Sequence, residues 1–237
     1  MHNMPDLKGH PLVLLPGLDG SGHLFSSFLG ALSAEYEPIV ATYPPDQRLD
    51  HEGLFPYIRE VIPGNVPYTL IAESFAGQLA LRFAEVQPRN LRALVLCASF
   101  VTNPLPPENW AARFLNDTVF QRSPSEAVLR KLLDTEEYAP PLLAAMQAAL
   151  ECVRPEVLSH RIRLALDTDA RAALRACQAP ILYLQAARDK LVDARSVEEI
   201  QAIRPDMTCE VVNAPHLLLH AKPREAWAAI RRFLARN

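Results

Sequence analysis

The sequence predicts an α/β fold in which helices cover both faces of a mainly parallel sheet. Short apolar runs, of the length expected for strands buried on both faces, alternate along the chain with longer segments of helical periodicity. A helical stretch without a convincing strand interrupts this alternation between about residues 100 and 176. This interruption predicts that a helical cap is inserted into the sheet domain.

The predicted strands are short apolar runs with a turn on either side. They are residues 11–15, 38–42, 68–72, 93–98, 181–185 and 209–212. The segments between them repeat apolar residues with the spacing of one helix face, which predicts amphipathic helices. These predicted helices are residues 23–32, 54–62, 76–86, 196–203 and 224–234.

The predicted cap opens on a proline-rich turn at residues 103–107. Helical segments follow at 125–133, 141–151 and 155–166. Residues 1–100 and 177–237 then form the core domain, and residues 101–176 form the cap. Because ligands of open α/β sheets bind at the carboxyl ends of the strands, we expect the cap to cover that edge. Trp110, Phe114 and Phe120 either line an apolar pocket there or pack the cap onto the sheet.

Composition narrows the class of protein. The chain has 237 residues, 49% of them hydrophobic and 22% charged, so it can bury a large core. A net charge of −3, with no basic cluster beyond Arg231 and Arg232, argues against nucleic-acid binding. No segment has the length of a membrane span, and residues 1–6 lack the pattern of a signal peptide. We therefore expect a cytoplasmic protein. The sequence does not determine its oligomeric state, and a homo-oligomer is one alternative.

The four cysteines give no sign of a disulfide framework or of a metal site. Cys97, Cys152, Cys177 and Cys209 are widely spaced and form no C-x-x-C pair. Cys97 lies in a continuous apolar run, where we expect a small buried side chain. The sequence thus predicts no bound metal.

The strongest functional signal is the junction between the predicted strand 68–72 and the helix that follows it. Residues 68–80 read YTLIAESFAGQLA, with Ser74 at the turn. A nucleophile elbow, usually G-x-S-x-G, places a serine at such a turn and needs small residues two positions before and after it. Ala72 and Ala76 stand at those positions, and alanine still meets the steric requirement. The alternative is an ordinary serine that caps a helix.

A serine hydroxyl becomes a good nucleophile when a base accepts its proton. Among the seven histidines, His216 follows the predicted strand 209–212 and a short turn, which places it at the same sheet edge as Ser74. His220 is the competing candidate, although we interpret it as a residue next to the last helix. The sequence therefore predicts His216 as the base.

The base needs a carboxylate that fixes its tautomer and stabilises the imidazolium. Asp189 follows the predicted strand 181–185 and fills this role, whereas we interpret Asp193 as the N-cap of the next helix. The chain order of Ser74, Asp189 and His216 is the order expected for a nucleophile elbow in a parallel sheet.

Acyl chemistry also needs backbone donors where negative charge develops on the substrate oxygen. The amide of Phe75 is one predicted donor, and the amide of Leu18 is the other. Leu18 lies in a glycine-rich loop, LLPGLDGSG, at residues 14–22. This spacing of glycines matches neither of the common phosphate-binding motifs, so we do not expect a nucleotide. Glu73 either tunes the site or is a solvated or supporting carboxylate.

Four segments together resemble the bacterial esterase and lipase branch of the α/β-hydrolase superfamily. They are LLPGLDGSG (14–22), AESF (72–75), RDKLV (188–192) and PHLLL (215–219). The E-S-F element also resembles that of plastid phytyl ester synthases. The resemblance covers nearly the whole chain. It implies an α/β-hydrolase fold, and hydrolysis of a small-molecule carboxylic ester by a Ser-Asp-His triad without a cofactor.

The resemblance leaves the substrate open, since the superfamily also contains peptidases, thioesterases, acyltransferases and haloperoxidases. An acyltransferase or a thioesterase on the same scaffold is the nearest alternative to an esterase. A non-catalytic protein that binds a small molecule is the alternative from another class. The presence of Ser74, Asp189 and His216 in the expected order argues against it.

Overall fold

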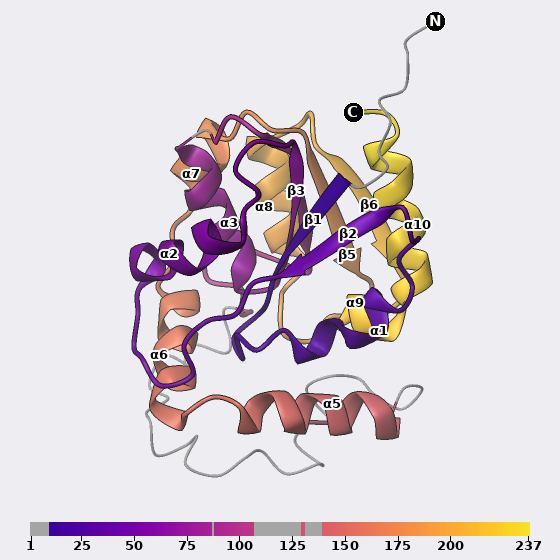
Figure 1. The fold of residues 1–237 in the computed structure, drawn as a ribbon. Helices are drawn as coiled ribbons and strands as arrows, with labels where there is room; N and C mark the ends of the chain where they lie inside the picture. The colour runs from indigo at the N-terminus through magenta and orange to yellow at the C-terminus, as the bar shows by residue number, and fades with distance from the viewer. Residues whose placement is uncertain (1–9, 87, 107–128, 131–138) are drawn as a thin grey trace, which may run out of the picture.

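The computed structural model describes residues 10–86, 88–106, 129–130 and 139–237. Within this part, six strands form one parallel sheet in the order β2-β1-β3-β4-β5-β6 (Figure 1). Every predicted strand is confirmed, with ends that shift by at most two residues. The strands are β1 (His10–Leu15), β2 (Tyr36–Val40), β3 (Tyr68–Glu73), β4 (Leu91–Cys97), β5 (Ile181–Ala186) and β6 (Thr208–Val212).

Helices cover both faces of this sheet, which confirms the predicted fold class (Figure 1). One face carries α2 (His51–Val61), α3 (Ala76–Glu85), α7 (Arg171–Ala176) and α8 (Arg195–Ile203). The other face carries α1 (Ser26–Leu29), α9 (Leu218–Ala221) and α10 (Pro223–Leu234).

Two helices differ from their predicted bounds by three residues or more. The predicted helix 23–32 is a short 3-10 turn, η1 (His23–Phe25), followed by α1, which ends before Gly30. Helix α2 begins three residues before its predicted start at 54. Its N-cap is Asp50, whose carboxylate accepts a hydrogen bond from the Gly53 amide at 2.8 Å.

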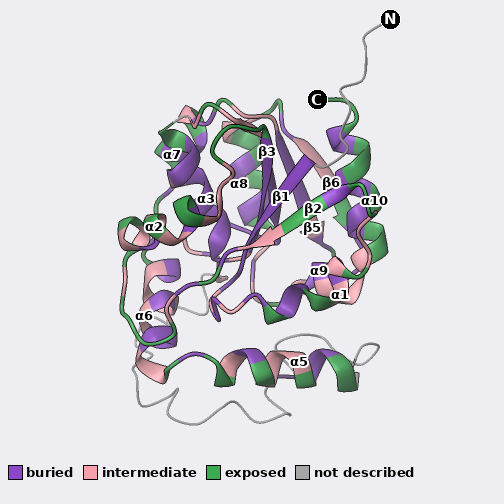
Figure 2. Ribbon diagram, viewed as in Figure 1, coloured by how far each residue is buried: buried purple, intermediate pink, exposed green. Residues whose placement is uncertain are grey.

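Alternate residues of the central strands enter two separate cores, as strand geometry requires. In β1, Val13 and Leu15 pack against the α2–α3 side, whereas Leu12 and Leu14 pack against the α1–α10 side. All residues of β1 and β3 are buried, as Figure 2 shows. The strand ends that carry the predicted site residues therefore rest on a closely packed sheet.

The described part of the predicted cap is helical. It contains α5 (Ala139–Glu151) and α6 (Pro155–Leu166), followed by α7. Helix α5 crosses the carboxyl end of the sheet (Figure 1), where Leu142 packs against Leu24 and Leu217. Helix α7 instead packs against α3 and α8 in the layer over the sheet. Trp110, Phe114, Phe120 and most of the predicted helix 125–133 lie outside the described residues.

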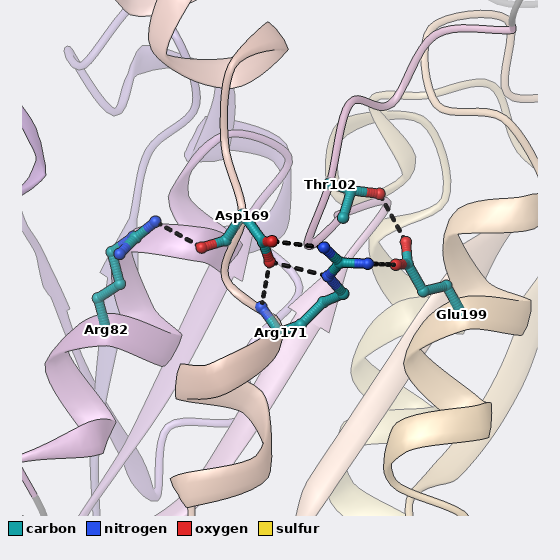
Figure 3. Close-up of polar contacts among 5 residues, drawn as sticks. All are labelled: Arg82, Thr102, Asp169, Arg171 and Glu199. Carbon is teal, nitrogen blue, oxygen red and sulfur yellow. Dashed lines mark hydrogen bonds and ion pairs between the residues drawn. The ribbon is translucent and has the colours of Figure 1, made fainter.

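A polar network joins both ends of this helical stretch to the core (Figure 3). The Asp169 carboxylate accepts from Arg171 Nε at 2.9 Å, and its backbone carbonyl accepts from Arg82 of α3 at 2.8 Å. Thr102 donates to Glu199 of α8 at 2.6 Å, and Arg171 lies 3.8 Å from the same carboxylate. The network thus holds the segment that follows β4 beside the segment that leads into α7.

The four cysteines are free, and Cys97 is buried as predicted. None of the described helices has the length and apolar character needed to cross a membrane.

Candidate active site

Ser74 lies at the turn between β3, which ends at Glu73, and α3, which begins at Ala76. Its φ of 54° falls in the left-handed region, which residues other than glycine rarely adopt. Such a conformation costs roughly 1–3 kcal/mol and persists where the surrounding contacts fix it. Ala72 and Ala76, two positions before and after Ser74, are fully buried, so the tight turn leaves room only for small side chains.

Hydrogen bonds from two neighbouring chain segments fix the Ser74 backbone. The Ser74 amide donates to the Cys97 carbonyl at 2.8 Å, and the Ser74 carbonyl accepts from the Gly77 amide at 3.0 Å. The same carbonyl accepts from the Ser99 hydroxyl at 2.8 Å, and the Ser99 carbonyl accepts from the Tyr183 hydroxyl at 2.7 Å. The sequence alone did not point to Ser99 or Tyr183: Ser99 directly follows the predicted strand 93–98, and Tyr183 is the middle residue of the predicted strand 181–185.

Ser74, His216 and Asp189 form a continuous chain of hydrogen bonds. The Ser74 Oγ lies 2.9 Å from His216 Nε2, and His216 Nδ1 lies 2.8 Å from Asp189 Oδ2. The other carboxylate oxygen of Asp189 accepts from the amides of Leu191 and Val192 at 2.8 and 2.9 Å. The tautomer with its proton on Nδ1 suits both neighbours of His216, since it donates to Asp189 and accepts from the Ser74 hydroxyl.

The surroundings of His216 favour its protonated form. The side chains of His216 and Asp189 are only 5% and 8% exposed, whereas Ser74 is half-buried. Burial alone lowers the pKa of His216, but the Asp189 carboxylate outweighs it, with a smaller contribution from Glu73, and the net pKa is raised. A raised pKa strengthens His216 as an acceptor of the serine proton.

The competing residues lie elsewhere. His220 belongs to α9, where its Nδ1 lies 3.2 Å from the Leu24 carbonyl and its Nε2 lies 3.5 Å from the Ser27 hydroxyl. The predicted N-cap role of Asp193 is wrong, since Ala194 is the N-cap of α8, although the Asp193 carboxylate accepts from the Arg195 amide at 2.9 Å. Neither side chain joins the hydrogen-bonded chain that begins at Ser74.

The loop after β1 passes directly beside Ser74. A Cβ added at Gly17 would lie 3.9 Å from the Ser74 Cβ, and Leu18 is the next residue. In the described part of the chain, neither the Leu18 amide nor the Phe75 amide donates to a backbone carbonyl. The two predicted donors are therefore available to an oxygen atom of a molecule bound at Ser74.

Apolar residues that are close to the site residues along the chain pack against the helical segment between β4 and β5. Leu24 and Leu217 pack with α5, and Leu191 lies against the same cluster. Leu18 packs against Val153, Val157 and Leu158 at the junction of α5 and α6. The residues beside the predicted donor, the base and the acid thus contribute hydrophobic surface.

Glu73 is buried, so the interpretation as a solvated carboxylate is wrong. The residue is 2% exposed, directly before Ser74, and pairs with Cys97 across β3 and β4. Burial raises the pKa of the Glu73 carboxyl to about 8, although His216 lowers it and Asp19 raises it further. Glu73 is therefore largely protonated at neutral pH.

We expect Glu73→Gln to remove a pH-dependent loss of stability. The pKa of Glu73 rises from 4.5 to about 8 on folding, so the folded state binds this proton more tightly than the unfolded state. The contribution of Glu73 to stability therefore falls as pH rises through this window and is level above it. The expected change between pH 5 and pH 8 is on the order of 3 kcal/mol.

Urea unfolding of both proteins at pH 5, 6, 7 and 8 measures this effect. The free energy of unfolding of the variant, minus that of the wild type, should increase steadily with pH. Glu37→Gln makes the same change at an exposed strand residue and should leave the difference flat. Parallel pH profiles for Glu73→Gln and the wild type would contradict the burial of a protonated carboxyl.

Within the described ranges, no group of three or more His, Cys, Asp or Glu residues could hold a metal ion.

Solved structures share the fold over nearly the whole chain. An esterase from Thermogutta terrifontis is 20% identical, with a TM-score of 0.77 over 96% of this chain and 90% of that one. An enol-lactonase from Burkholderia xenovorans is 15% identical, with a TM-score of 0.78 over 97% and 92% of the two chains. A bromoperoxidase from Bacillus anthracis is 17% identical, with a TM-score of 0.78 over 95% and 92%. At these identities the likeness shows the fold alone.

Sequence comparison also relates the chain to one segment of a much longer protein. The polyketide synthase ThaQ of Burkholderia thailandensis is 27% identical over a 222-residue alignment, and the match covers 84% of this chain and 10% of that protein. The alpha/beta hydrolase family matches residues 12–230, nearly the full length. The chain therefore belongs to the alpha/beta hydrolase family.

Proposed function

We propose that the protein is a serine hydrolase that cleaves carboxylic esters through an acyl-enzyme on Ser74. The observation that carries this proposal is the unbroken chain from Ser74 Oγ to His216 and on to Asp189, at 2.9 and 2.8 Å. A strained serine at a strand-to-helix turn, beside two unused backbone donors, supports the same chemistry.

In the first half-reaction, Ser74 Oγ attacks the ester carbonyl carbon while its proton passes to His216 Nε2. The carbonyl oxygen becomes an oxyanion, which the Leu18 and Phe75 amides bind. The carbon–oxygen bond to the alcohol then breaks, and His216 returns the proton to the departing alkoxide. Asp189 stabilises the imidazolium that exists between these two proton transfers.

Water completes the cycle by the same route. His216 removes a proton from a water molecule, which attacks the acyl-enzyme carbonyl. The tetrahedral intermediate collapses, the carboxylic acid leaves, and Ser74 regains its proton from His216. Each half-reaction develops one oxyanion, so the same pair of amides serves both.

The surroundings favour an uncharged, apolar substrate. Leu18, Leu191 and Leu217 lie within two residues of the predicted donor, acid and base along the chain, and they belong to apolar clusters formed with α5 and α6. Among the described residues, the buried Arg or Lys side chain is Arg161, which donates to the backbone carbonyls of Leu18, Asp19 and Pro44. An aliphatic acyl or alcohol group gains free energy from burial against such a surface, whereas a charged group would be desolvated without a partner.

A thioester is the second candidate substrate. Polyketides are built from acyl thioesters, and the match to a segment of a polyketide synthase favours this class. The attack by Ser74 is the same on a thioester carbonyl, with a thiol in place of the alcohol as the leaving group.

A fluorophosphonate probe, followed by peptide mass spectrometry, tests the nucleophile. The wild type should carry the adduct on Ser74, and Ser74→Ala should carry none. Turnover of p-nitrophenyl esters from acetate to palmitate, beside the matching acyl thioesters of N-acetylcysteamine, then identifies the substrate class. The chain length that is hydrolysed fastest then measures the size of the acyl pocket.

The outcomes separate the alternatives. A labelled Ser74 with ester formation from an added alcohol indicates an acyltransferase. A wild type that neither labels nor turns over any ester or thioester contradicts the proposal and favours a binding protein. Faster turnover of thioesters than of esters at every chain length would identify thioesters as the substrate class.

A further inference from the structure

Arg161 is a buried cation that the reaction scheme does not use. It lies on α6 and is 1% exposed, which makes it one of the largest fully buried side chains described. Its Nη1 donates to the carbonyls of Leu18 and Asp19 at 2.8 and 3.0 Å, and its Nη2 donates to the Pro44 carbonyl at 2.9 Å. Its guanidinium also lies 5.6 Å from the centre of the Tyr43 ring. A planar guanidinium can bind such divergent acceptors in one fixed orientation.

These acceptors belong to the loops that follow β1 and β2. Both loops lie at the carboxyl edge of the sheet, and Arg161 reaches them from the helical segment between β4 and β5. Gly20 fits closely against this side chain, because a Cβ there would lie 2.5 Å from Arg161 Nη1. Burial lowers the pKa of the Arg161 guanidinium, and Tyr43 and the Asp19 carboxylate partly offset this. The Asp19 carboxylate also accepts from the Ser21 amide at 2.8 Å.

The same loop orients the Leu18 amide. The Gly17 carbonyl accepts from the Gly20 amide at 3.2 Å, which directs this carbonyl into the loop. In a trans peptide the N–H points away from the C=O, so the Leu18 N–H points out of the loop. Gly17 is also the loop residue that lies close to the Ser74 Cβ. Arg161 binds the next two carbonyls, so it restricts rotation of the peptide planes that follow the donor.

We propose that Arg161 is a positioning residue that holds the Leu18 amide in place as an oxyanion donor. The proposal rests on the proposed function, since it presupposes an oxyanion at Ser74. Arg161 does not touch the reacting atoms. It acts through the carbonyls of Leu18 and Asp19. Its loss therefore raises the free energy of the transition state, which carries the oxyanion, more than that of the bound substrate.

Three variants test this inference. Arg161→Met keeps the length of the side chain and removes every donor, and Arg161→Lys keeps the charge and can bind only some of the carbonyls. Arg154→Met makes the first substitution at an exposed residue just before α6. We measure kcat and KM on p-nitrophenyl butyrate and the melting temperature of each protein. We also measure inhibition by an alkyl trifluoromethyl ketone and by the methyl ketone of equal length.

The two ketones separate positioning from general loss of structure. Ser74 Oγ adds to the trifluoromethyl ketone, its proton passes to His216, and the ketone oxygen becomes an oxyanion. The methyl ketone remains a ketone and reports only the apolar pocket. For Arg161→Met we expect kcat to fall roughly 10- to 100-fold, with KM within about twofold of the wild type. The inhibition constant of the trifluoromethyl ketone should rise by a similar factor, and that of the methyl ketone should not change.

The kcat and the trifluoromethyl ketone inhibition constant of Arg161→Lys should lie between those of Arg161→Met and the wild type. Both values for Arg154→Met should match the wild type. If Arg161→Met does not fold, the kcat and the ketone pair of Arg161→Lys carry the test. An active wild type, together with unchanged kcat and ketone inhibition in folded Arg161 variants, would overturn the inference and leave the proposed function intact. A wild type without turnover and without a labelled Ser74 would overturn the proposed function first, and this inference with it.

Discussion

Replacing Asp189 by asparagine is expected to lower the kcat of ester hydrolysis by about 10⁴-fold, the loss typical of this change in a Ser-His-Asp site. The structure gives the reason. Oδ1 of Asp189 accepts from the amides of Leu191 and Val192, so the carbonyl oxygen of an asparagine will take that position. Its NH₂ group then faces His216 Nδ1, where Asp189 Oδ2 lies at 2.8 Å. His216 must accept there, which moves its proton to Nε2 and leaves no lone pair for the proton of Ser74.

Steady-state kinetics with the preferred p-nitrophenyl ester measures the loss. The melting temperature should change little, because the asparagine keeps the shape of the side chain and the bonds from both amides. Asp193→Asn is the matched control, since Asp193 lies four residues away and pairs with Arg195 at the surface. Its kcat should stay within about twofold of the wild type. Retention of more than a tenth of the activity in Asp189→Asn would show that this carboxylate does not orient the base.

The sequence predicted the sheet well because each of its strands is short, apolar and bounded by turns. In a parallel sheet all carboxyl ends meet at one edge. A residue directly after a strand is therefore placed by the strand itself, as Ser74 is, and Asp189 lies only three residues beyond β5. His216 was predictable for the same reason, although it lies four residues beyond β6. The predicted positions required only the order of elements along the chain.

The residues that support the centre could not be predicted in this way. Arg161 reaches Leu18 across 143 positions of the sequence, and its place on α6 depends on how the helical segment packs. Ser99 follows β4, but nothing in the sequence says that its hydroxyl turns toward Ser74. The charge of Glu73 predicted a side chain exposed to solvent. Glu73 is instead buried, because every residue of β3 is buried. Such roles depend on tertiary contacts between distant segments.

Replacing Gly77 by alanine is expected to destabilise the protein by about 4 kcal/mol or more. Alanine usually stabilises a helix relative to glycine by about 1 kcal/mol, so local propensity predicts the opposite sign. Packing decides the outcome, because a Cβ at Gly77 would lie 1.7 Å from Ser99 Oγ and 2.6 Å from Ser99 Cβ. Rotation of the hydroxyl relieves the first clash but not the second. The start of α3 must then move away from the end of β4, and Ser74 lies between them.

Thermal unfolding should show a fall in melting temperature of roughly 8 to 16 °C for a chain of this size. Gly64→Ala is the matched control, since a Cβ there meets nothing within 4 Å, and its melting temperature should not fall. A second replacement tests the cause. Ser99→Gly in the Gly77→Ala background removes both clashing atoms and leaves only Leu96 Cδ2, at 3.3 Å. It should restore most of the stability but not all of kcat, because the Ser74 carbonyl still lacks the hydroxyl of Ser99. If Ser99→Gly fails to rescue the stability of Gly77→Ala, contact with Ser99 is not what requires a glycine beside the nucleophile.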